Sequence, residues 1–239
     1  MNRFIIPCFV ALLSLSLLTA CDDHELVDLE IHTGYILCSD GRIIDERDFN
    51  HEVHTPVAVV FAPKTESHEI LAVLLDELPS IAFADTLAMD QKTSGDVTAY
   101  DGYTNTVALQ TNYLKRDSLV VKDYKADPRN YYCSPLGLSA FRSHWFFQSD
   151  YVPSVAELSL LYLSLNTVNP IIERCGGTPI STTADGAGCW YWSSTEVNEN
   201  RVNQAWLVSM ADGSRHRAPK TNHYHARLIV EYNPINIKQ

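Results

Sequence analysis

Long hydrophobic runs are scarce in this chain beyond its first twenty residues. No uninterrupted apolar stretch after them is longer than that from Val57 to Ala62, whereas a membrane-spanning helix needs roughly 18–20 apolar residues. A run of this length suits a buried β-strand instead. We therefore expect no transmembrane helix after residue 20, and a body that folds in water.

Positive charge is also sparse. The 239 residues hold 18 Lys and Arg against 29 Asp and Glu, and the basic residues are scattered among the acidic ones. A surface that binds nucleic acid needs clustered Lys and Arg that neutralise phosphates and release counterions. The sequence therefore argues against nucleic acid as a partner.

The common catalytic signatures are missing as well. The chain has no Gly-x-Ser-x-Gly turn, no Walker phosphate loop and no glycine series of the dinucleotide-binding type. No two cysteines have the Cys-x-x-Cys spacing that is typical of zinc and redox sites. These absences favour a protein without enzymatic activity.

The first 21 residues have the features of a bacterial lipoprotein signal. Arg3 provides a basic start, residues 4–18 are almost wholly apolar, and a Leu-Thr-Ala triplet precedes Cys21. Small residues before a cysteine let a peptidase cut there, and the new N-terminal cysteine can then carry acyl chains. We predict a signal peptide over residues 1–20 and lipidation of Cys21. An ordinary secretory peptide or an uncleaved anchor helix is the alternative.

Residues 21–33 are predicted to be a lipidated tether. More than one acyl chain makes attachment to the membrane stable, because each buried methylene contributes about 0.8 kcal/mol. Asp22, Asp23 and Glu25 resemble the acidic export signal of some Gram-negative bacteria, although a solvated spacer has the same composition. We expect a mature chain of net charge about −12, since only Arg3 is lost. Its predicted location is the outer membrane of a Gram-negative bacterium, exposed at the cell surface.

Few cysteines remain after Cys21, and these are Cys38, Cys133, Cys175 and Cys189. In an exported chain four thiols can pair in three ways. Cys175 and Cys189 bracket a glycine-rich loop, and closing about 15 residues is worth roughly 3 kcal/mol in the chain-entropy model. We predict a Cys175–Cys189 disulfide. Cys38 with Cys133 follows by elimination, and free thiols are the alternative.

Residues 34–239 are predicted to form a single domain, because no low-complexity linker or internal repeat divides them. The pattern indicates four strands in its first part, at Tyr35–Cys38, Arg42–Ile44, Val57–Phe61 and Glu69–Leu75. The last of these also fits a helical period. Residues 84–130 are polar and weakly periodic, which predicts long loops around one short helix near Thr104–Tyr113.

The clearest predicted helix begins after Ser154. The Ser154 hydroxyl can accept a hydrogen bond from a first-turn amide while Glu157 reaches back to the Ser154 amide, an arrangement called a capping box. Apolar residues from Val155 to Leu165 then share one face. Separate short helices are predicted over Val168–Arg174 and from Pro135 through Arg142.

The last third alternates as β-strands do. The predicted strands are Trp190–Ser194, Ala205–Met210, Ser214–Arg217 and His223–Tyr232. In the last of them Tyr224 and Ala226 lie on one face, opposite His223 and His225. Strands, then helices, then strands predict an α+β fold with an antiparallel sheet.

Several motifs resemble those of a known group of bacterial domains. They are Tyr151-Val152-Pro153-Ser154-Val155-Ala156-Glu157-Leu158, Tyr191-Trp192-Ser193-Ser194-Thr195-Glu196, Ala205-Trp206, Asp212-Gly213, Lys220 and Ala226-Arg227, with Asp101-Gly102-Tyr103-Thr104-Asn105-Thr106 upstream. In order and spacing, over roughly residues 95–232, they resemble the Fibrobacter-type major paralogous domain and the C-terminal domain of collagen-like bacterial adhesins. One departure is Asp150-Tyr151-Val152-Pro153 in place of the usual Trp-Arg/Tyr-Leu-Pro.

This resemblance implies a C-type-lectin-like fold, similar to that of formylglycine-generating enzymes. Such a fold has a twisted antiparallel sheet, two or three helices and long loops. The resemblance does not identify a ligand for this chain.

Aromatic residues are the first candidates for ligand contact, because ring faces suit the C–H surfaces of sugars. The candidates are Trp190 and Trp192 on a strand, and Tyr100, Tyr103, Tyr131 and Tyr132 in loops. Glu196 and Asn198 add oxygen donors roughly where lectin-like folds place calcium. The chain lacks the Glu-Pro-Asn and Trp-Asn-Asp pairs of sugar-binding calcium lectins, so we expect no cofactor, with calcium as the alternative. His216, His223 and His225 could bind a metal ion together. Histidines that simply lie on the surface of an edge strand are more common, so we favour that explanation.

Together these patterns predict a non-catalytic surface lipoprotein, held to the membrane by its lipid anchor. Its predicted role is that of a binding or adhesion module for glycans or for another envelope protein. One alternative is a structural or accessory subunit of a surface fibre or envelope complex. A second is an enzyme of the formylglycine-generating type that uses Cys175 or Cys189.

Overall fold

The computed structural model describes residues 30–84, 87–114, 136, 150–186 and 188–233. The chain divides into a first unit, Met1–Glu30, and a second, Ile31–Gln239, which holds every helix and strand given below. The predicted signal peptide and Cys21 lie outside the described residues. So does the helix predicted from Pro135 through Arg142, apart from Leu136.

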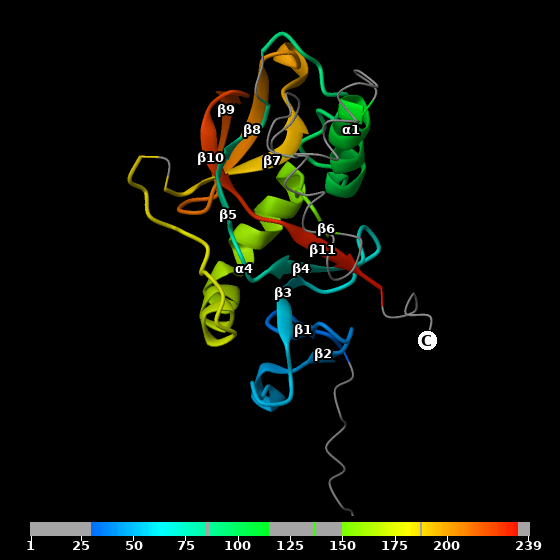
Figure 1. Ribbon diagram of the computed structural model, residues 1–239, viewed down its shortest axis with the longest axis vertical. Helices are drawn as coiled ribbons and strands as arrows, with labels where there is room; N and C mark the ends of the chain where they lie inside the picture. The colour runs from blue at the N-terminus through cyan, green and yellow to red at the C-terminus, as the bar shows by residue number, and fades with distance from the viewer. Residues whose placement is uncertain (1–29, 85–86, 115–135, 137–149, 187, 234–239) are drawn as a thin grey trace, which may run out of the picture. The chain divides into compact units, whose positions relative to one another are not determined.

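Six of the described strands form one antiparallel sheet. They are β1 (Ile36–Cys38), β2 (Ile43–Ile44), β3 (Pro56–Ala62), β4 (Ile70–Leu74), β6 (Asp150–Tyr151) and β11 (Ile229–Tyr232). Their order is β2-β1-β3-β4-β11-β6 (Figure 1). The four strands predicted in the first part of the domain correspond to β1 to β4 and are confirmed. Val59 and Val60 are both buried although they face opposite ways, because β3 is central and covered on both faces.

Five further strands form a second sheet. They are β5 (Leu78–Ala82), β7 (Trp190–Glu196), β8 (Gln204–Ser209), β9 (Arg215–Pro219) and β10 (His223–Ala226). Their order is β5-β10-β7-β8-β9. The neighbours are antiparallel except β10 and β7, which run parallel where His225 pairs with Tyr191. The strands predicted at 190–194 and 205–210 are confirmed. β5 was not predicted, because Pro79 and Ser80 interrupt its apolar pattern.

Two described α-helices lie against these sheets. α4 (Val155–Arg174) contacts β3, β7 and β8, and α1 (Gly102–Leu114) contacts β6 and β7. The predicted capping box of α4 is present: Ser154 Oγ accepts from the Glu157 amide at 3.4 Å, and Glu157 Oε2 accepts from the Ser154 amide at 2.6 Å. Short 3-10 helices η1 (Glu46–Asp48) and η3 (Asn198–Asn200) complete the described helices.

The main core lies between α4 and both sheets. Leu158 and Leu161 of α4 are fully buried in one cluster with Val59 of the first sheet and Tyr191 of the second. Each fully buried leucine contributes roughly 1.5–3 kcal/mol. One helix therefore stabilises both sheets at once.

α4 is one helix of 20 residues, so the predicted division into two helices is wrong. Pro170 lies inside it and removes one backbone hydrogen bond. Packing outweighs that loss, because Val168 and Ile172 are fully buried and Asn169 exchanges two hydrogen bonds of 2.9 Å with the backbone of Ile180. By length and composition alone α4 could cross a membrane, but half of it is buried, as in the core helix of a globular domain.

The predicted strand His223–Tyr232 is also two elements. β10 belongs to the second sheet and β11 to the first, so the chain changes sheets at Arg227 and Leu228. The buried Arg227 guanidinium donates to the carbonyls of Leu74 and Leu75 at 2.8 and 2.7 Å. The α+β class with antiparallel pairing is confirmed, in two sheets where one was predicted.

Candidate functional site

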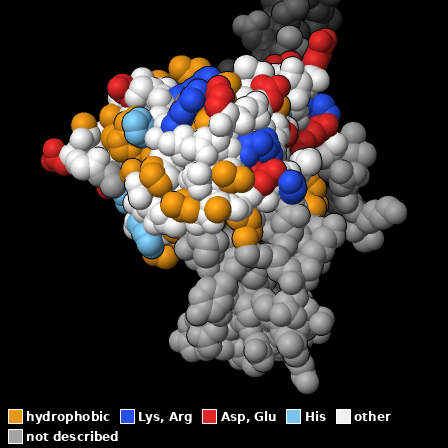
Figure 2. All heavy atoms as spheres, turned by 90° about the horizontal axis from the view of Figure 1, so that it is seen from above, with side chains coloured by type: hydrophobic (Ala, Val, Ile, Leu, Met, Phe, Trp, Pro, Cys, Tyr) orange, Lys and Arg blue, Asp and Glu red, His pale blue; other side chains and the backbone are white. Residues whose placement is uncertain are grey.

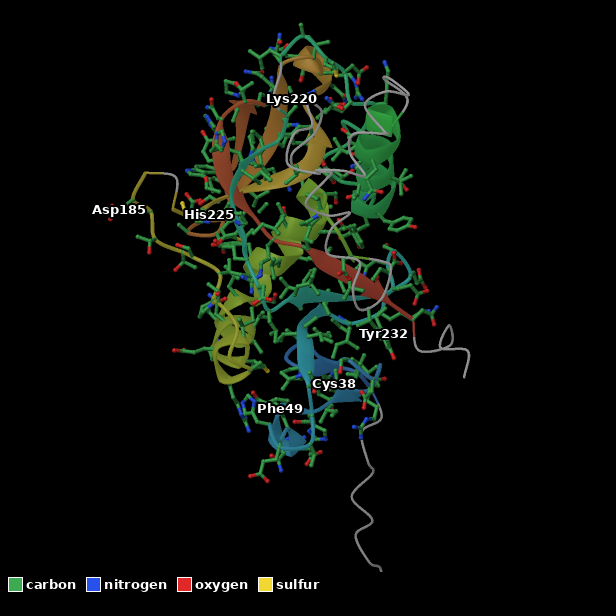
Figure 3. The ribbon with its side chains drawn as sticks, in the orientation of Figure 1. Cys38, Phe49, Asp185, Lys220, His225 and Tyr232 are labelled. Atoms are coloured by element: carbon green, nitrogen blue, oxygen red, sulfur yellow. The ribbon has the colours of Figure 1, made fainter. Side chains whose placement is uncertain are left out.

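One face of the second sheet bears a shallow pocket of about 350 Å³, here called the aromatic pocket. It is lined by Gly186, Trp190, Leu207, His216 and Tyr224. Strand register brings these side chains together, because Leu207 of β8 pairs with Trp192 on one side and with His216 on the other. Side chains two residues apart on a strand share a face, which places Trp190 beside them. Gly186 comes from the loop around Asp185, which extends away from the sheet (Figure 3).

The rings of the aromatic pocket contact one another and the core. The ring centroids of Trp190 and His216 are 5.6 Å apart, and Tyr224 packs edge-on against Trp192 at 5.2 Å. Trp192 is fully buried, and its Nε1 donates to the Ile81 carbonyl at 2.9 Å. Trp192 is therefore a core residue with no surface to offer a ligand, which corrects its prediction. Trp190 is only half-buried and remains a candidate.

The pocket suits a ligand with an apolar face and a few polar groups. Trp190 and Tyr224 supply aromatic surface, and the exposed His216 supplies ring nitrogens that donate or accept. None of the described residues that line the pocket is acidic. Seen from above, the surface shows histidine side chains beside hydrophobic ones in one area and mixed acidic and basic side chains elsewhere (Figure 2).

A second polar group, here called the Glu77 cluster, lies where the chain passes between the sheets. Glu77 Oε1 is 2.5 Å from His225 Nδ1, and Oε2 accepts from the Tyr191 hydroxyl at 2.6 Å. Arg227 Nη1 is 3.8 Å from Oε2. Burial raises the pKa of Tyr191, and the hydrogen bond to Glu77 adds to the rise. This cluster joins the β4–β5 turn to β7 and β10, so its role is to stabilise the fold.

Glu196 is fully buried, which corrects its prediction as a ligand-binding residue. It forms an ion pair with Lys220, which is also fully buried. Its two oxygens also accept from the amides of Gln91 and Thr93 at 2.8 and 3.1 Å, and Arg201 lies 3.2 Å away. Burial lowers the pKa of Lys220, and Glu196 opposes that shift. The carboxylate therefore holds the segment around residues 91–93 against the second sheet, near Lys220 in Figure 3.

The other described candidates lie outside the aromatic pocket. Asn198 Nδ2 donates to the Gly95 carbonyl at 3.2 Å, and its Oδ1 accepts from Arg201 at 3.1 Å, so the side chain fixes a loop. Tyr100 and Tyr103 are 39% and 49% exposed and do not line the pocket. Tyr131 and Tyr132 lie outside the described residues.

The three cysteines that the structure describes carry free thiols. The predicted Cys175–Cys189 disulfide is therefore not formed in it. Cys175 is buried in the main core at the end of α4, whereas Cys189 lies beside Ser209, whose Oγ is 3.7 Å from the Cys189 sulfur. The intervening loop extends outward instead of closing (Figure 3). Cys133 lies outside the described residues.

Metal-ligating side chains do not gather in the described part of the chain, where no group of three or more His, Cys, Asp and Glu could hold an ion. His216 faces Trp190 in the aromatic pocket and His225 faces Glu77. The oxygens of Glu196 are occupied by Lys220 and backbone amides. No calcium-binding set is therefore centred on Glu196.

Sequence reasoning found Trp190 but missed His216 and Tyr224 as its neighbours. Alternation along residues 223–232 did place Tyr224 on the face opposite His225. What it could not supply is the strand order that brings β10 and β9 to either side of β7 and β8. Pairing of aromatic residues on neighbouring strands would have been the available signal.

No family of known proteins and no curated protein matches the chain. Its fold is similar to that of a fimbrial protein from Bacteroides ovatus in a crystal structure, with a TM-score of 0.57 and 19% sequence identity. The likeness covers 84% of this chain and 49% of that chain, so this chain spans about half the length of its neighbour. At this identity the likeness shows a shared fold.

Proposed function

We propose that this protein is a non-catalytic adhesion component of the bacterial cell surface, which binds its ligand at the aromatic pocket. The observation that carries the proposal is the pocket itself, where Trp190, His216 and Tyr224 come together on one face of a sheet. The likeness of fold to a fimbrial protein supports a surface setting. The motifs over residues 95–232, which resemble lectin-like domains, support a binding role.

A glycan is the ligand class that we propose. Sugar rings have C–H faces that pack on aromatic rings, and hydroxyl groups that a histidine nitrogen can bind. A pocket of about 350 Å³ lies at the small end of the range for small-molecule sites. It therefore suits one or two sugar units at the end of a chain.

Binding of purified protein to a glycan array tests the proposal. Replacing Trp190 by Ala is expected to weaken binding about tenfold or more, because stacking of this kind contributes roughly 0.5–1.5 kcal/mol in addition to the area that the ring buries, and about 1.4 kcal/mol is tenfold in affinity. The matched control is Trp206→Ala on β8, whose ring lies under Arg217, 4.8 Å from the guanidinium carbon, and does not line the pocket.

Both variants are first compared with the unaltered protein by thermal unfolding. Equal loss of binding in the two variants, or binding that survives Trp190→Ala, would place the ligand elsewhere.

The leading alternative is a structural or accessory subunit of a surface fibre. The likeness to a fimbrial protein is the observation that favours it. Sedimentation and electron microscopy of the protein at micromolar concentration separate the two roles. Ordered higher oligomers without glycan binding would support the structural subunit.

An enzyme of the formylglycine-generating type receives the least support. Its chemistry needs reactive thiols, but Cys175 and Cys189 are both buried. Burial also raises the pKa of Cys175 to about 11, which leaves little thiolate at neutral pH.

Attachment to the outer membrane through Cys21 is the other part of the proposal. Mass spectrometry of the protein extracted from membranes should find diacyl or triacyl modification on Cys21, and a Cys21→Ser variant should be released from the membrane. Protease treatment of intact cells then tests exposure, because only protein on the outer face is digested.

A further inference from the structure

Cys38 and Cys175 share one side of the main core, although 136 residues separate them in sequence. On β1, Ile36 and Cys38 belong to the cluster that contains α4, while Leu37 between them belongs to the cluster on the opposite face. Cys175 directly follows α4 and is buried in that same cluster. Both side chains are therefore on the helix-covered side of β1.

The C-terminal end of α4 is held close to β1 by independent contacts. A Cβ placed on Gly34, two residues before β1, would lie 2.9 Å from Cδ1 of Ile171. Ile171 is one helical turn before Cys175. The His51 ring also hydrogen-bonds to the Arg174 carbonyl at 2.7 Å, which fixes the segment after β2 against the same helix end.

The surroundings of Cys38 belong to this region too. Figure 3 shows Cys38 and Phe49 in the region of β1 and β2, and both are members of the same core cluster. Burial raises the pKa of the Cys175 thiol to about 11, and the Cys38 thiolate contributes to this rise. This contribution agrees with the placement of both thiols in the same core cluster.

We propose that Cys38 and Cys175 form a disulfide when the chain folds in an oxidising compartment. Each Sγ–H loses its proton, the Sγ–Sγ bond forms, and the two electrons reduce one disulfide of the oxidant to two thiols. The bond would join β1 to the end of α4. The inference rests on export of the chain, which belongs to the proposed function, but it requires nothing of the aromatic pocket.

The bond is expected to form during folding and not afterwards. A thiolate is the species that attacks a disulfide, and a buried thiol of raised pKa supplies little of it. We therefore expect the pair to close before the core excludes the oxidant.

Peptide mapping tests the pairing. The full chain is unfolded, reduced, refolded in a mixture of oxidised and reduced glutathione, alkylated and digested without reductant. The expected product joins the peptide of Cys38 to that of Cys175 and leaves Cys189 alkylated. A product that joins Cys175 to Cys189 or Cys38 to Cys133, or alkylation of both Cys38 and Cys175, would overturn the proposal.

Thermal unfolding with and without reductant provides a second readout. Closing a loop of this length should raise the melting temperature by about 5–15 °C, so reductant should lower it by that amount. A Cys189→Ser variant should keep the full response, while Cys38→Ser should lose it. An equal response to reductant in Cys38→Ser and the unaltered protein would contradict the pairing. Glycan binding is measured on the same samples, so failure of the disulfide and failure of the proposed function are distinguished.

Discussion

Glu196 and Lys220 form an ion pair whose two side chains are both fully buried. Lys220 Nζ also donates to the Met89 carbonyl at 2.8 Å, and Glu196 accepts from two amides of the segment around residues 91–93. Taking charges out of water is costly, so such a pair stabilises only while both partners are present. The segment and the sheet are therefore held together by charges that cannot be removed singly.

Glu196→Gln is expected to lower the free energy of unfolding by about 3–5 kcal/mol, because it leaves the ammonium group of Lys220 buried without its ion-pair partner. The control is Glu199→Gln, which breaks the exposed pair with Arg217 at 3.3 Å and should cost under about 1 kcal/mol. Urea denaturation measures both variants. Similar losses in the two would mean that Lys220 finds solvent or another partner.

Asp150 is a buried carboxyl that has no hydrogen-bond partner among the described residues. Burial raises its pKa to about 6, above the value of about 3.9 in an unfolded chain. The folded state therefore binds its proton more tightly, so its contribution is fully favourable below about pH 4 and is lost as pH rises through about 6. Asp150 thus destabilises the folded protein at neutral pH.

Asp150→Asn is expected to raise the free energy of unfolding at pH 7.5 by about 1–3 kcal/mol and to change it little at pH 3.5. Denaturation curves of both proteins across this range provide the measurement. Asp185→Asn, at an exposed carboxyl, is the control and should show no such divergence. A constant difference at every pH would point to packing and not to the charge.

At the scale of elements, the start of α4 is organised by a few side chains. Besides its part in the capping box, the Ser154 hydroxyl donates to the Ala99 carbonyl at 2.8 Å, and the Tyr151 hydroxyl donates to Glu157 at 3.0 Å. Gly102 lies against them so closely that a Cβ there would be 2.3 Å from Glu157 Oε2. The helix start thus fixes the beginning of α1 as well.

Ser154→Ala is expected to cost about 1–2 kcal/mol, since it removes the cap and the hydrogen bond to the half-buried Ala99 carbonyl. Ser164→Ala on the same helix is the matched control. Its hydroxyl bonds only to the Leu161 carbonyl at 2.9 Å, so the change should be neutral or stabilise by up to about 0.5 kcal/mol. Chemical denaturation compares the two variants. Equal effects on the free energy of unfolding would contradict a stabilising role for the Ser154 cap.

Local signals predicted the elements that local interactions determine. The capping box of α4 and the strands β3, β7 and β8 could be predicted because a few adjacent residues specify them. The continuity of α4 through Pro170 could not, since it depends on core packing and on Ile180. The change of sheet at Arg227 depends likewise on Leu74 and Leu75, far away in sequence.

The candidate site divides in the same way. Trp190 was accessible to sequence reasoning as an aromatic residue on a strand. The burial of Trp192 and Glu196 was not, because it depends on which elements cover β7: α1 lies over it, and the segment around residues 91–93 binds Glu196. Strand order across β9, β8, β7 and β10 is a property of the whole sheet.

At the scale of the whole molecule, the two sheets are joined through Arg227 and α4. Arg227 is fully buried between β10 and β11, and its guanidinium donates to two carbonyls at the end of β4 while facing Glu77. Burial lowers the pKa of Arg227, and Glu77 opposes that shift. α4 packs on strands of both sheets. Such shared packing should make the described domain unfold as one cooperative unit.

Arg227→Met is expected to lower the free energy of unfolding by about 3–5 kcal/mol, because it removes the donors to the carbonyls of Leu74 and Leu75 and the cation that faces Glu77. Arg215→Met, at an exposed position on β9, is the control and should cost under about 0.5 kcal/mol. Hydrogen exchange followed by mass spectrometry shows which strands lose stability in the Arg227→Met variant. If α4 couples the sheets, exchange should accelerate to the same extent in β4 and in β7, whereas acceleration confined to β10 and β7 would show that the second sheet opens alone.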